Sequence, residues 1–295
     1  MDTNQLLAFI TVAETGSFSL AAEKLHLTQP AISKRIAILE ETLAASLFDR
    51  IGRRVLLTEA GKLLLPRARK ILLDIHDTGT SIRNLTAQVG GRLALASSHH
   101  IGLHRLPPIL KEFTRRYAQV SVDISFLDSE EAYDRVLHGD IELAVVTLSP
   151  GAMGRIQYQR LWSDPLSFMA ARDHPLAERR ELGLKDLLDY PSILPAENTF
   201  TRQLVEDIFS GRNLALNVEM STNYLETIRM MVSIGMAWSV LPDTMLEESL
   251  VVLPVRNANL IRELGYIYHR DHTLSNAASA FIRTLEQSVG MGVSG

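Results

Sequence analysis

The spacing of apolar side chains in the first forty residues predicts three short helices. Apolar residues recur there every three to four positions, as on one face of a helix. The predicted helices cover residues 4–14, 20–25 and 29–40. Thr15–Gly16 should end the first helix, and Ser17 or Ser19 can cap the second. Three short helices in such close succession are typical of a helix-turn-helix unit.

The third of these helices has two chemically different faces. Thr28 can cap it, and Pro30 lies in its first turn, where a missing N–H costs little. The inward positions are Ile32, Ile36 and Leu39. The opposite face carries side chains that suit base edges and phosphates in the major groove of DNA, namely Gln29, Ser33, Lys34 and Arg35. Spacing alone leaves open a plain three-helix scaffold whose last helix is solvated.

A short hairpin is predicted directly after this unit. Residues 47–50 and 55–57 have the composition of two strands, and the connection between them contains Gly52. Arginines gather at the end of this hairpin, at Arg50, Arg53 and Arg54. A hairpin that carries these cations can lie against phosphate or in the minor groove as a wing.

A heptad pattern predicts one long helix from Thr58–Glu59 to about Gln88. Its seam positions are Leu64, Ala68, Ile71, Ile75, Thr78, Ile82, Leu85 and Val89. At about 1.5 Å per residue the helix would be about 45 Å long, and a second copy of itself could bury such a seam. A helix buried against its own domain would give the same pattern. Pro66 should kink the helix or free a carbonyl, and Gly90–Gly91 should form a hinge.

From Arg92 onward, predicted strands and helices alternate, which indicates α/β lobes with mostly parallel sheets. The predicted strands are residues 93–98, 120–126, 141–148, 166–171, 192–196, 217–221, 237–242, 251–255 and 264–270. The predicted helices are residues 103–117, 129–138, 185–189, 201–209, 225–234 and 275–289. About 200 residues are enough for two such lobes, and ligands of open sheets bind at the carboxyl ends of strands.

Three polar segments lie at junctions between these strands and helices. Hydroxyl groups and free N–H groups at such junctions can hold an anion, so we expect them to line a ligand cleft. The candidate residues are Ser97, Ser98, His99, His100, Thr147, Thr199, Phe200, Thr201 and Arg202. Each polar group can equally be an ordinary helix cap. Adjacent histidines point in different directions, and no carboxylate stands at a ligand-like spacing from them, so we expect no metal site and no cofactor.

Composition and charge narrow the function. The net charge of -4 argues against nucleic-acid binding, but residues 24–70 hold 10 basic and only 4 acidic side chains. The absence of cysteine excludes disulfides, iron–sulfur clusters and a thiol switch. A secretory signal and an 18-residue apolar run are both missing from the sequence, so we expect a cytoplasmic protein without a membrane partner. The hydrolase, Walker A, dinucleotide-binding and metalloprotease motifs are also missing, and we therefore expect no enzyme.

The segment FSLAAEKLHLTQPAISKRIAILEETLAASLFDRIGRRVLLTEAG closely resembles the DNA-binding signature of LysR-type transcriptional regulators. The resemblance is dense over residues 1–66. One departure is Ala44–Ala45, where the family often has Leu-Gly, and it affects a turn rather than the face that reads DNA.

This resemblance implies a domain organisation. A winged helix-turn-helix domain would cover residues 1–57, a linker helix residues 58–89, and an effector domain with the periplasmic-binding-protein fold residues 90–295. The effector domain would have two lobes, with crossovers near Ser163 and Gly265. The first lobe would contain about residues 91–163 and 266–295, and the second about residues 164–265.

The resemblance also implies partners and roles. Thr28, Gln29, Pro30, Ser33, Lys34 and Arg35 would contact the major groove of promoter DNA, and the three wing arginines would contact phosphate. The linker helix would pair two chains, and two dimers would form a tetramer. The hydroxyl groups at the strand ends and the cation of Arg202 suggest that a small polar, anionic metabolite in the cleft modulates DNA binding. RNA polymerase would be a further partner. The alternative is a two-lobed binding protein or an α/β enzyme fused to a helix-turn-helix.

Overall fold

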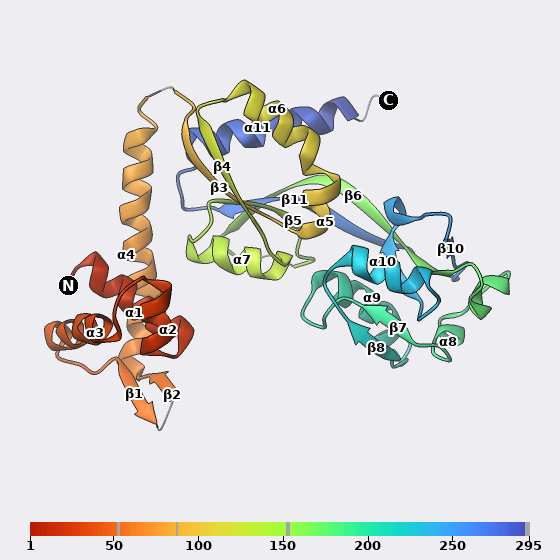
Figure 1. The fold of residues 1–295 in the computed structure, drawn as a ribbon, viewed down its shortest axis with the longest axis horizontal. Coiled ribbons are helices and arrows are strands. Elements are labelled where there is room, and N and C mark those ends of the chain that lie inside the picture. The colour runs from red at the N-terminus through yellow and green to blue at the C-terminus, as the bar shows by residue number, and fades with distance from the viewer. Residues whose placement is uncertain (52–53, 87, 152–153, 293–295) are drawn as a thin grey trace. The chain divides into compact units, whose positions relative to one another are not determined.

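The computed structural model describes residues 1–51, 54–86, 88–151 and 154–292 (Figure 1). The chain forms two compact units, Met1–Thr86 and Ala87–Gly295. The first unit contains four helices and a hairpin among its described residues. These elements are α1 (Thr3–Thr15), α2 (Phe18–Lys24), α3 (Gln29–Leu43), β1 (Phe48–Ile51), β2 (Arg54–Leu57) and α4 (Glu59–Arg83).

The predicted caps and the three-helix prediction are confirmed. The Ser17 side chain accepts a hydrogen bond from the N–H of Leu20 and thus caps α2, while the Thr28 side chain caps α3. The inward residues Ile32, Ile36 and Leu39 are buried in a core that also contains side chains of α1 and α2. The hydrophobic spacing of this segment therefore correctly predicted three helices that pack together as a helix-turn-helix.

The heptad seam of α4 is divided between two environments. Leu64, Ala68 and Ile71 pack against the core of the first unit. This half of the helix is therefore buried against its own domain, which was the alternative to pairing with a second copy. Ile75 and Ile82 are 52% and 63% exposed. α4 runs without interruption through Pro66 and ends at Arg83, earlier than predicted. Beyond its end, the N–H and the hydroxyl of Thr86 both bond the Arg83 carbonyl.

Gly61 explains how closely α4 approaches the hairpin. A Cβ atom at this position would collide with the backbone oxygen of Leu47 and with the side chain of Leu57. The N-cap of α4, Thr58, also donates its hydroxyl to the carbonyl of Ser46 at 2.7 Å. The hairpin and the start of α4 are therefore fixed to one another by direct backbone contact.

Ala44 adopts a left-handed backbone conformation, φ 51° and ψ 36°, at the C-cap of α3. A β-carbon is disfavoured there, and glycine is the usual residue at such positions. We expect Ala44→Gly to raise the free energy of unfolding by about 1 kcal/mol, since this strain is of that size. Ala45→Gly is the matched control, because Ala45 has no positive φ, and it should give no gain. Thermal unfolding measures both, and equal responses would contradict the assignment of strain.

The second unit is built on one seven-stranded sheet with the order β10-β6-β11-β5-β3-β4, where β9 pairs with β6. Its strands are β3 (Gly91–Ser97), β4 (Val120–Phe126), β5 (Leu143–Thr147), β6 (Ile156–Ala171), β9 (Ser239–Pro242), β10 (Leu250–Val252) and β11 (Leu260–His269). A separate pair consists of β7 (Ser192–Leu194) and β8 (Val218–Ser221). The α/β prediction is confirmed, but the prediction of mostly parallel pairing is wrong for this sheet. Only β3 pairs in parallel there, with β4 and β5, because the long strands β6 and β11 run antiparallel and set the direction of their neighbours.

Helices cover this sheet, and Figure 1 shows α6 and α11 lying together over one part of it. The α-helices of the unit are α5 (His99–His104), α6 (Leu106–Arg116), α7 (Ser129–His138), α8 (Leu184–Leu187), α9 (Phe200–Ser210), α10 (Leu225–Ser233) and α11 (Asn276–Gly292). Two short 3-10 helices are Pro175–Glu178 and Asp243–Met245. The prediction of one helix over residues 103–117 is wrong. Two prolines follow Leu106 and fit only the first turn of a helix, so a new helix starts there.

Two lobes share the long strands. One core lies under β3–β5 and contains Leu264, with Trp162 packed against it, whereas the other contains Leu166 and Leu260. β6 and β11 therefore pass from one core to the other between these residues. The predicted crossover Ser163 lies on β6 between Trp162 and Leu166, where the strand passes from one core to the other. The predicted crossover Gly265 lies on β11 one residue beyond Leu264, just outside the corresponding stretch. At Gly265 the pairing of β11 with β6 shifts register, and a Cβ atom would collide with the Gln159 carbonyl.

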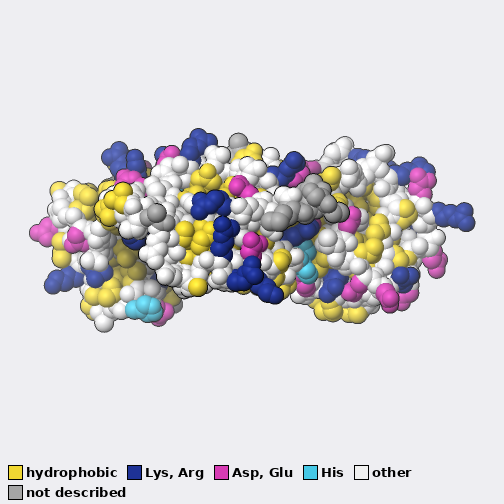
Figure 2. Space-filling model, turned by 90° about the horizontal axis from the view of Figure 1, so that it is seen from above, with side chains coloured by type: hydrophobic (Ala, Val, Ile, Leu, Met, Phe, Trp, Pro, Cys, Tyr) yellow, Lys and Arg dark blue, Asp and Glu magenta, His cyan; other side chains and the backbone are white. Residues whose placement is uncertain are grey.

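Charged and apolar side chains are mixed on the surface that Figure 2 shows. Lys and Arg side chains gather near the middle of that face, with acidic side chains among them. Among the described residues, no single helix is long and apolar enough to cross a membrane. The pair Thr3–Thr15 and Phe18–Lys24 meets the length and composition criteria only when the two helices, bent by 120°, are counted together.

Candidate functional site

The first candidate site is the outward face of α3. Gln29, Pro30 and Lys34 are exposed, and Ser33 and Arg35 are half-buried beside them. The Gln29 side-chain amide donates to the Ser33 hydroxyl at 2.9 Å, so these two groups form one hydrogen-bonding surface. Within the described parts of the chain, no ion pair engages Lys34 or Arg35. The structure thus brings the predicted polar residues of α3 together on one face with uncommitted positive charge.

The hairpin β1–β2 forms where it was predicted. Its register places Arg50 opposite Val55, and Ile51 opposite Arg54. The backbone of Arg50 and Arg54 is therefore part of the two strands. Their side chains and all of Arg53 lie outside the described residues, so the roles of the wing arginines stay predictions.

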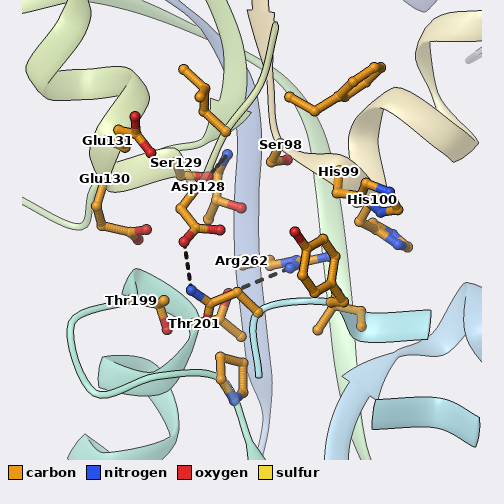
Figure 3. Close-up of a pocket in the computed structure, with 17 residues that line it drawn as sticks. Ser98, His99, His100, Asp128, Ser129, Glu130, Glu131, Thr199, Thr201 and Arg262 are labelled. Carbon is orange, nitrogen blue, oxygen red and sulfur yellow. Dashed lines mark hydrogen bonds between the residues drawn. The ribbon is translucent and has the colours of Figure 1, made fainter. Parts of the chain in front are cut away.

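The second candidate site is a cavity of about 230 Å³ where the two lobes of the second unit meet (Figure 3). The elements around it are α5 and α7 from one lobe, α9 and α10 from the other, and β11, which both share. Six predicted residues line it, namely Ser98, His99, His100, Thr147, Thr199 and Thr201. Ser98 begins α5 without a side-chain capping bond, whereas the Thr199 hydroxyl caps α9.

Three predicted residues do not line this cavity. The Ser97 hydroxyl is buried in the sheet and donates to the Val145 carbonyl at 3.0 Å. Phe200 packs edge-on against Tyr133. Arg202 is buried, and its guanidinium is fully engaged: it pairs with Glu206 at 2.7 Å and donates to the carbonyl of Pro195. The cation that we expected Arg202 to supply is thus committed elsewhere.

Arg262 supplies the guanidinium of the cavity instead. Its side chain is 5% exposed, its Nε lies 2.7 Å from a carboxylate oxygen of fully buried Asp164, and its Nη1 lies 3.5 Å from the Thr201 hydroxyl. Its Nη2 is buried with no hydrogen-bond partner among the described residues. Burial lowers the pKa of Arg262, and the charge of Asp164 opposes this shift. Sequence reasoning missed this pair because the residues are 98 positions apart, although β6 and β11 place them directly opposite one another.

Three carboxylates that the sequence did not single out also line the cavity, and each has a partner. Asp128 accepts from the Asn223 amide at 2.6 Å, and Glu130 accepts from the backbone N–H of Phe200 at 2.6 Å. The third, Glu131, pairs with the arginine one turn along α7. Burial raises the pKa of Glu130 although the Phe200 N–H opposes the shift. The first two bonds join α7 of one lobe to α9 and α10 of the other.

A cluster of imidazole and carboxylate groups lies at the α5 side of the cavity. Glu226 of α10 has one carboxylate oxygen 2.9 Å from Nε2 of His104 and 3.5 Å from Nδ1 of His100. His99 lies 3.6 Å from the other oxygen. The sequence offers no carboxylate at a ligand-like spacing from these histidines, but the tertiary fold brings Glu226 to them from the other lobe. Burial and the charge of Arg262 lower the pKa of His100 to about 4, so its imidazole is neutral at pH 7.

A helix-turn-helix with an exposed polar helix, followed by a two-lobed α/β unit with a polar cavity, defines a class of DNA-binding regulators that carry a small-molecule domain. The sequence model described as "Bacterial regulatory helix-turn-helix protein, lysR family" matches residues 3–62. The model described as "LysR substrate binding domain" matches residues 86–290. The chain belongs to the LysR family of transcriptional regulators, and the winged helix-turn-helix and effector-domain architecture is confirmed.

Individual relatives agree with this assignment. An uncharacterized HTH-type transcriptional regulator of Azotobacter vinelandii is 66% identical over 108 residues, which are 37% of this chain and 75% of that protein. The HTH-type transcriptional activator CmpR of Synechocystis is 30% identical over 95% of this chain and 93% of its own. The solved structure of a full-length OxyR variant from Pseudomonas aeruginosa shares the fold with a TM-score of 0.65, at 23% identity, over 97% of this chain and 98% of that one. These relatives are regulators, a non-enzymatic role.

Proposed function

We propose that this regulator binds promoter DNA through α3 and its wing, and that a small polar metabolite with one anionic group modulates this binding from the cavity. The observation that carries the ligand part is the guanidinium of Arg262, a residue that lines the cavity and whose buried Nη2 has no partner among the described residues. A buried N–H without an acceptor costs free energy, and an anionic ligand oxygen would supply the missing acceptor.

The surroundings of Arg262 are consistent with a ligand of this kind. The hydroxyls of Ser98 and Thr201 line the same cavity, and Figure 3 shows Arg262 between the α5 side and the α9 side. Of the three carboxylates at the start of α7, only Glu131 pairs with an arginine. Asp128 and Glu130 accept hydrogen bonds from neutral donors and keep their negative charge, so the anionic group of the ligand would lie on the Arg262 side of the cavity. Arg262 thus takes the role that the sequence suggested for Arg202.

A ligand screen by thermal unfolding tests the proposal. A carboxylate that binds should stabilise the chain by about 2.7 kcal/mol at one hundred times its Kd. The matched carboxamide should bind at least tenfold more weakly, because it lacks the charge that Arg262 recognises. Ser98→Ala and Thr201→Val should reduce the stabilisation, and Ser233→Ala, outside the cavity, should not. The proposal fails if no anionic metabolite stabilises the protein, or if all variants respond like the wild type.

DNA titrations separate base contacts from phosphate contacts on α3. Gln29→Ala and Ser33→Ala should alter sequence preference, with about 1–3 kcal/mol lost for each base contact removed. Lys34→Ala should weaken binding evenly across sequences and reduce the salt slope by about one unit. Thr42→Ala, at the far end of α3, serves as the control. Fluorescence anisotropy at several salt concentrations measures both effects, and wild-type selectivity in the Gln29 and Ser33 variants would refute the assignment of this face.

The remaining parts of the proposal concern assembly. Two chains would pair through the exposed half of α4, around Ile75 and Ile82, and two dimers would form a tetramer. RNA polymerase would be contacted from the bound promoter. The same function places the protein in the cytoplasm, where promoter DNA is accessible.

A further inference from the structure

His100 has a combination of burial and bonding that its surroundings do not explain. Its side chain is 5% exposed, and neither ring nitrogen has a hydrogen-bond partner among the described residues. An imidazole buried without partners costs free energy, so such a group indicates a missing ligand or ion. Figure 3 shows His99 and His100 together at the edge of the cavity.

Two further donor groups stand beside His100 in a ligand-like arrangement. His104 lies four residues later, which places both imidazoles on the same face of α5. Glu226, from the first turn of α10, completes a triad whose ligand atoms all lie within 4.8 Å of one another. One oxygen of Glu226 has no hydrogen-bond partner among the described residues, and the other bonds His104 at 2.9 Å and lies 3.5 Å from His100.

Two of the three separations between these atoms are close to those around a tetrahedral metal ion. Zinc bonds of 2.0–2.1 Å separate neighbouring tetrahedral ligand atoms by roughly 3.3 Å. The distances from the shared Glu226 oxygen are 2.9 Å to Nε2 of His104 and 3.5 Å to Nδ1 of His100. Two imidazoles and one carboxylate are a ligand set that zinc accepts with a fourth position open to water.

We propose that His100, His104 and Glu226 form a zinc site that joins the two lobes of the effector domain. The two histidines come from α5 of one lobe and the carboxylate from α10 of the other, so a bound ion would hold the lobes together at this edge. The site goes beyond the proposed function, since it does not depend on which metabolite enters the cavity.

Calorimetric titration of the untagged full-length protein with zinc chloride, after removal of metal by a chelator, tests the site. We expect one zinc ion per chain, and at least tenfold weaker binding in His104→Ala and in Glu226→Gln. The matched controls are His138→Gln and Glu219→Gln, which remove a histidine and a carboxylate away from the cluster and should bind zinc like the wild type. Cobalt substituted into the wild-type protein should show the visible absorption of tetrahedral coordination.

The variants are chosen so that loss of binding is not mistaken for loss of folding. His104 is 46% exposed in its side chain, and Glu226→Gln preserves shape, so both proteins should unfold at temperatures close to the wild type without metal. The proposal is overturned if no zinc binds, or if the two cluster variants bind as tightly as the controls. The titration contains neither DNA nor metabolite, so its failure would leave the DNA and effector proposals untouched, and their failure would leave the zinc site untouched.

Discussion

Arg262→Met should lower the free energy of unfolding of the effector domain by about 3 kcal/mol, because it leaves the Asp164 carboxylate buried without its principal charge partner. Asp164 is fully buried and bonds Arg262 at 2.7 Å. Arg105, 3.5 Å from the other Asp164 oxygen, remains and limits the loss. The tryptophan signal of urea unfolding isolates this domain, since both tryptophans of the chain, Trp162 and Trp238, belong to it.

Two further variants separate the buried pair from charge removal in general. Arg256→Met breaks an exposed ion pair with Glu181 and should cost less than 1 kcal/mol. The double variant Asp164→Leu, Arg262→Met should recover most of the stability lost in Arg262→Met, since no buried charge is then left unpaired. If Arg262→Met and Arg256→Met have the same free energy of unfolding, the buried carboxylate of Asp164 does not need Arg262 to offset its charge. Arg262→Met should also abolish the stabilisation of the protein by anionic ligands.

Ile75→Asp combined with Ile82→Asp should weaken binding to paired DNA half-sites by about 10²–10⁴-fold, because it would separate the two reading heads and remove their avidity. Both side chains are more than half exposed on α4, so the substitutions should spare the fold of a single chain. Binding to an isolated half-site should change little. Sedimentation of the protein measures the predicted loss of pairing directly, and anisotropy measures the loss of DNA affinity.

The control for this prediction places the same charge on an equally exposed apolar position elsewhere. Leu246 is 48% exposed in the effector domain, and Leu246→Asp should leave pairing through α4 and DNA affinity intact. If the α4 double variant still sediments like the wild type and binds paired half-sites with unchanged affinity, the exposed half of α4 is not the dimer interface.

Local signals in the sequence were enough to predict the first unit. Apolar spacing identified α1 to α3, and Thr28 marked the start of α3. Of the two caps offered for α2, Ser17 is the cap, and the helix starts two residues earlier than predicted. The hairpin followed from a glycine between two short apolar strands. These interactions connect residues only a few positions apart, so the chain order itself carries the information. The heptad seam was less informative, because Ala68 and Ile75 occupy the same position in successive heptads and yet lie in different environments.

The cavity depended on contacts between distant segments, which periodicity does not encode. Residues at strand ends, such as Ser98 and Thr147, were found because a strand end is a local feature. Arg262 and Glu226 were missed because they meet their partners through pairing of β6 with β11 and through closure of one lobe on the other. The first half of β6 mixes polar and apolar residues without clear periodicity, and it pairs there with β11. The short spacing from His100 to His104 was visible, but the predicted helix began too late to include both residues.

The continuous pairing of β6 with β11 limits how the effector domain can respond mechanically. Ladder pairs run from Ile156 opposite His269 to Leu166 opposite Leu260, across the passage between the lobes. Two strands tied to each other in this way resist sliding and independent rotation, so the lobes retain one soft motion, the bending of a two-stranded ribbon. The register shift at Leu264/Gly265 is the weakest point of that ribbon and would set the axis of the bend. A metabolite bound in the cavity, as proposed above, would therefore change the angle between the lobes rather than slide one lobe past the other.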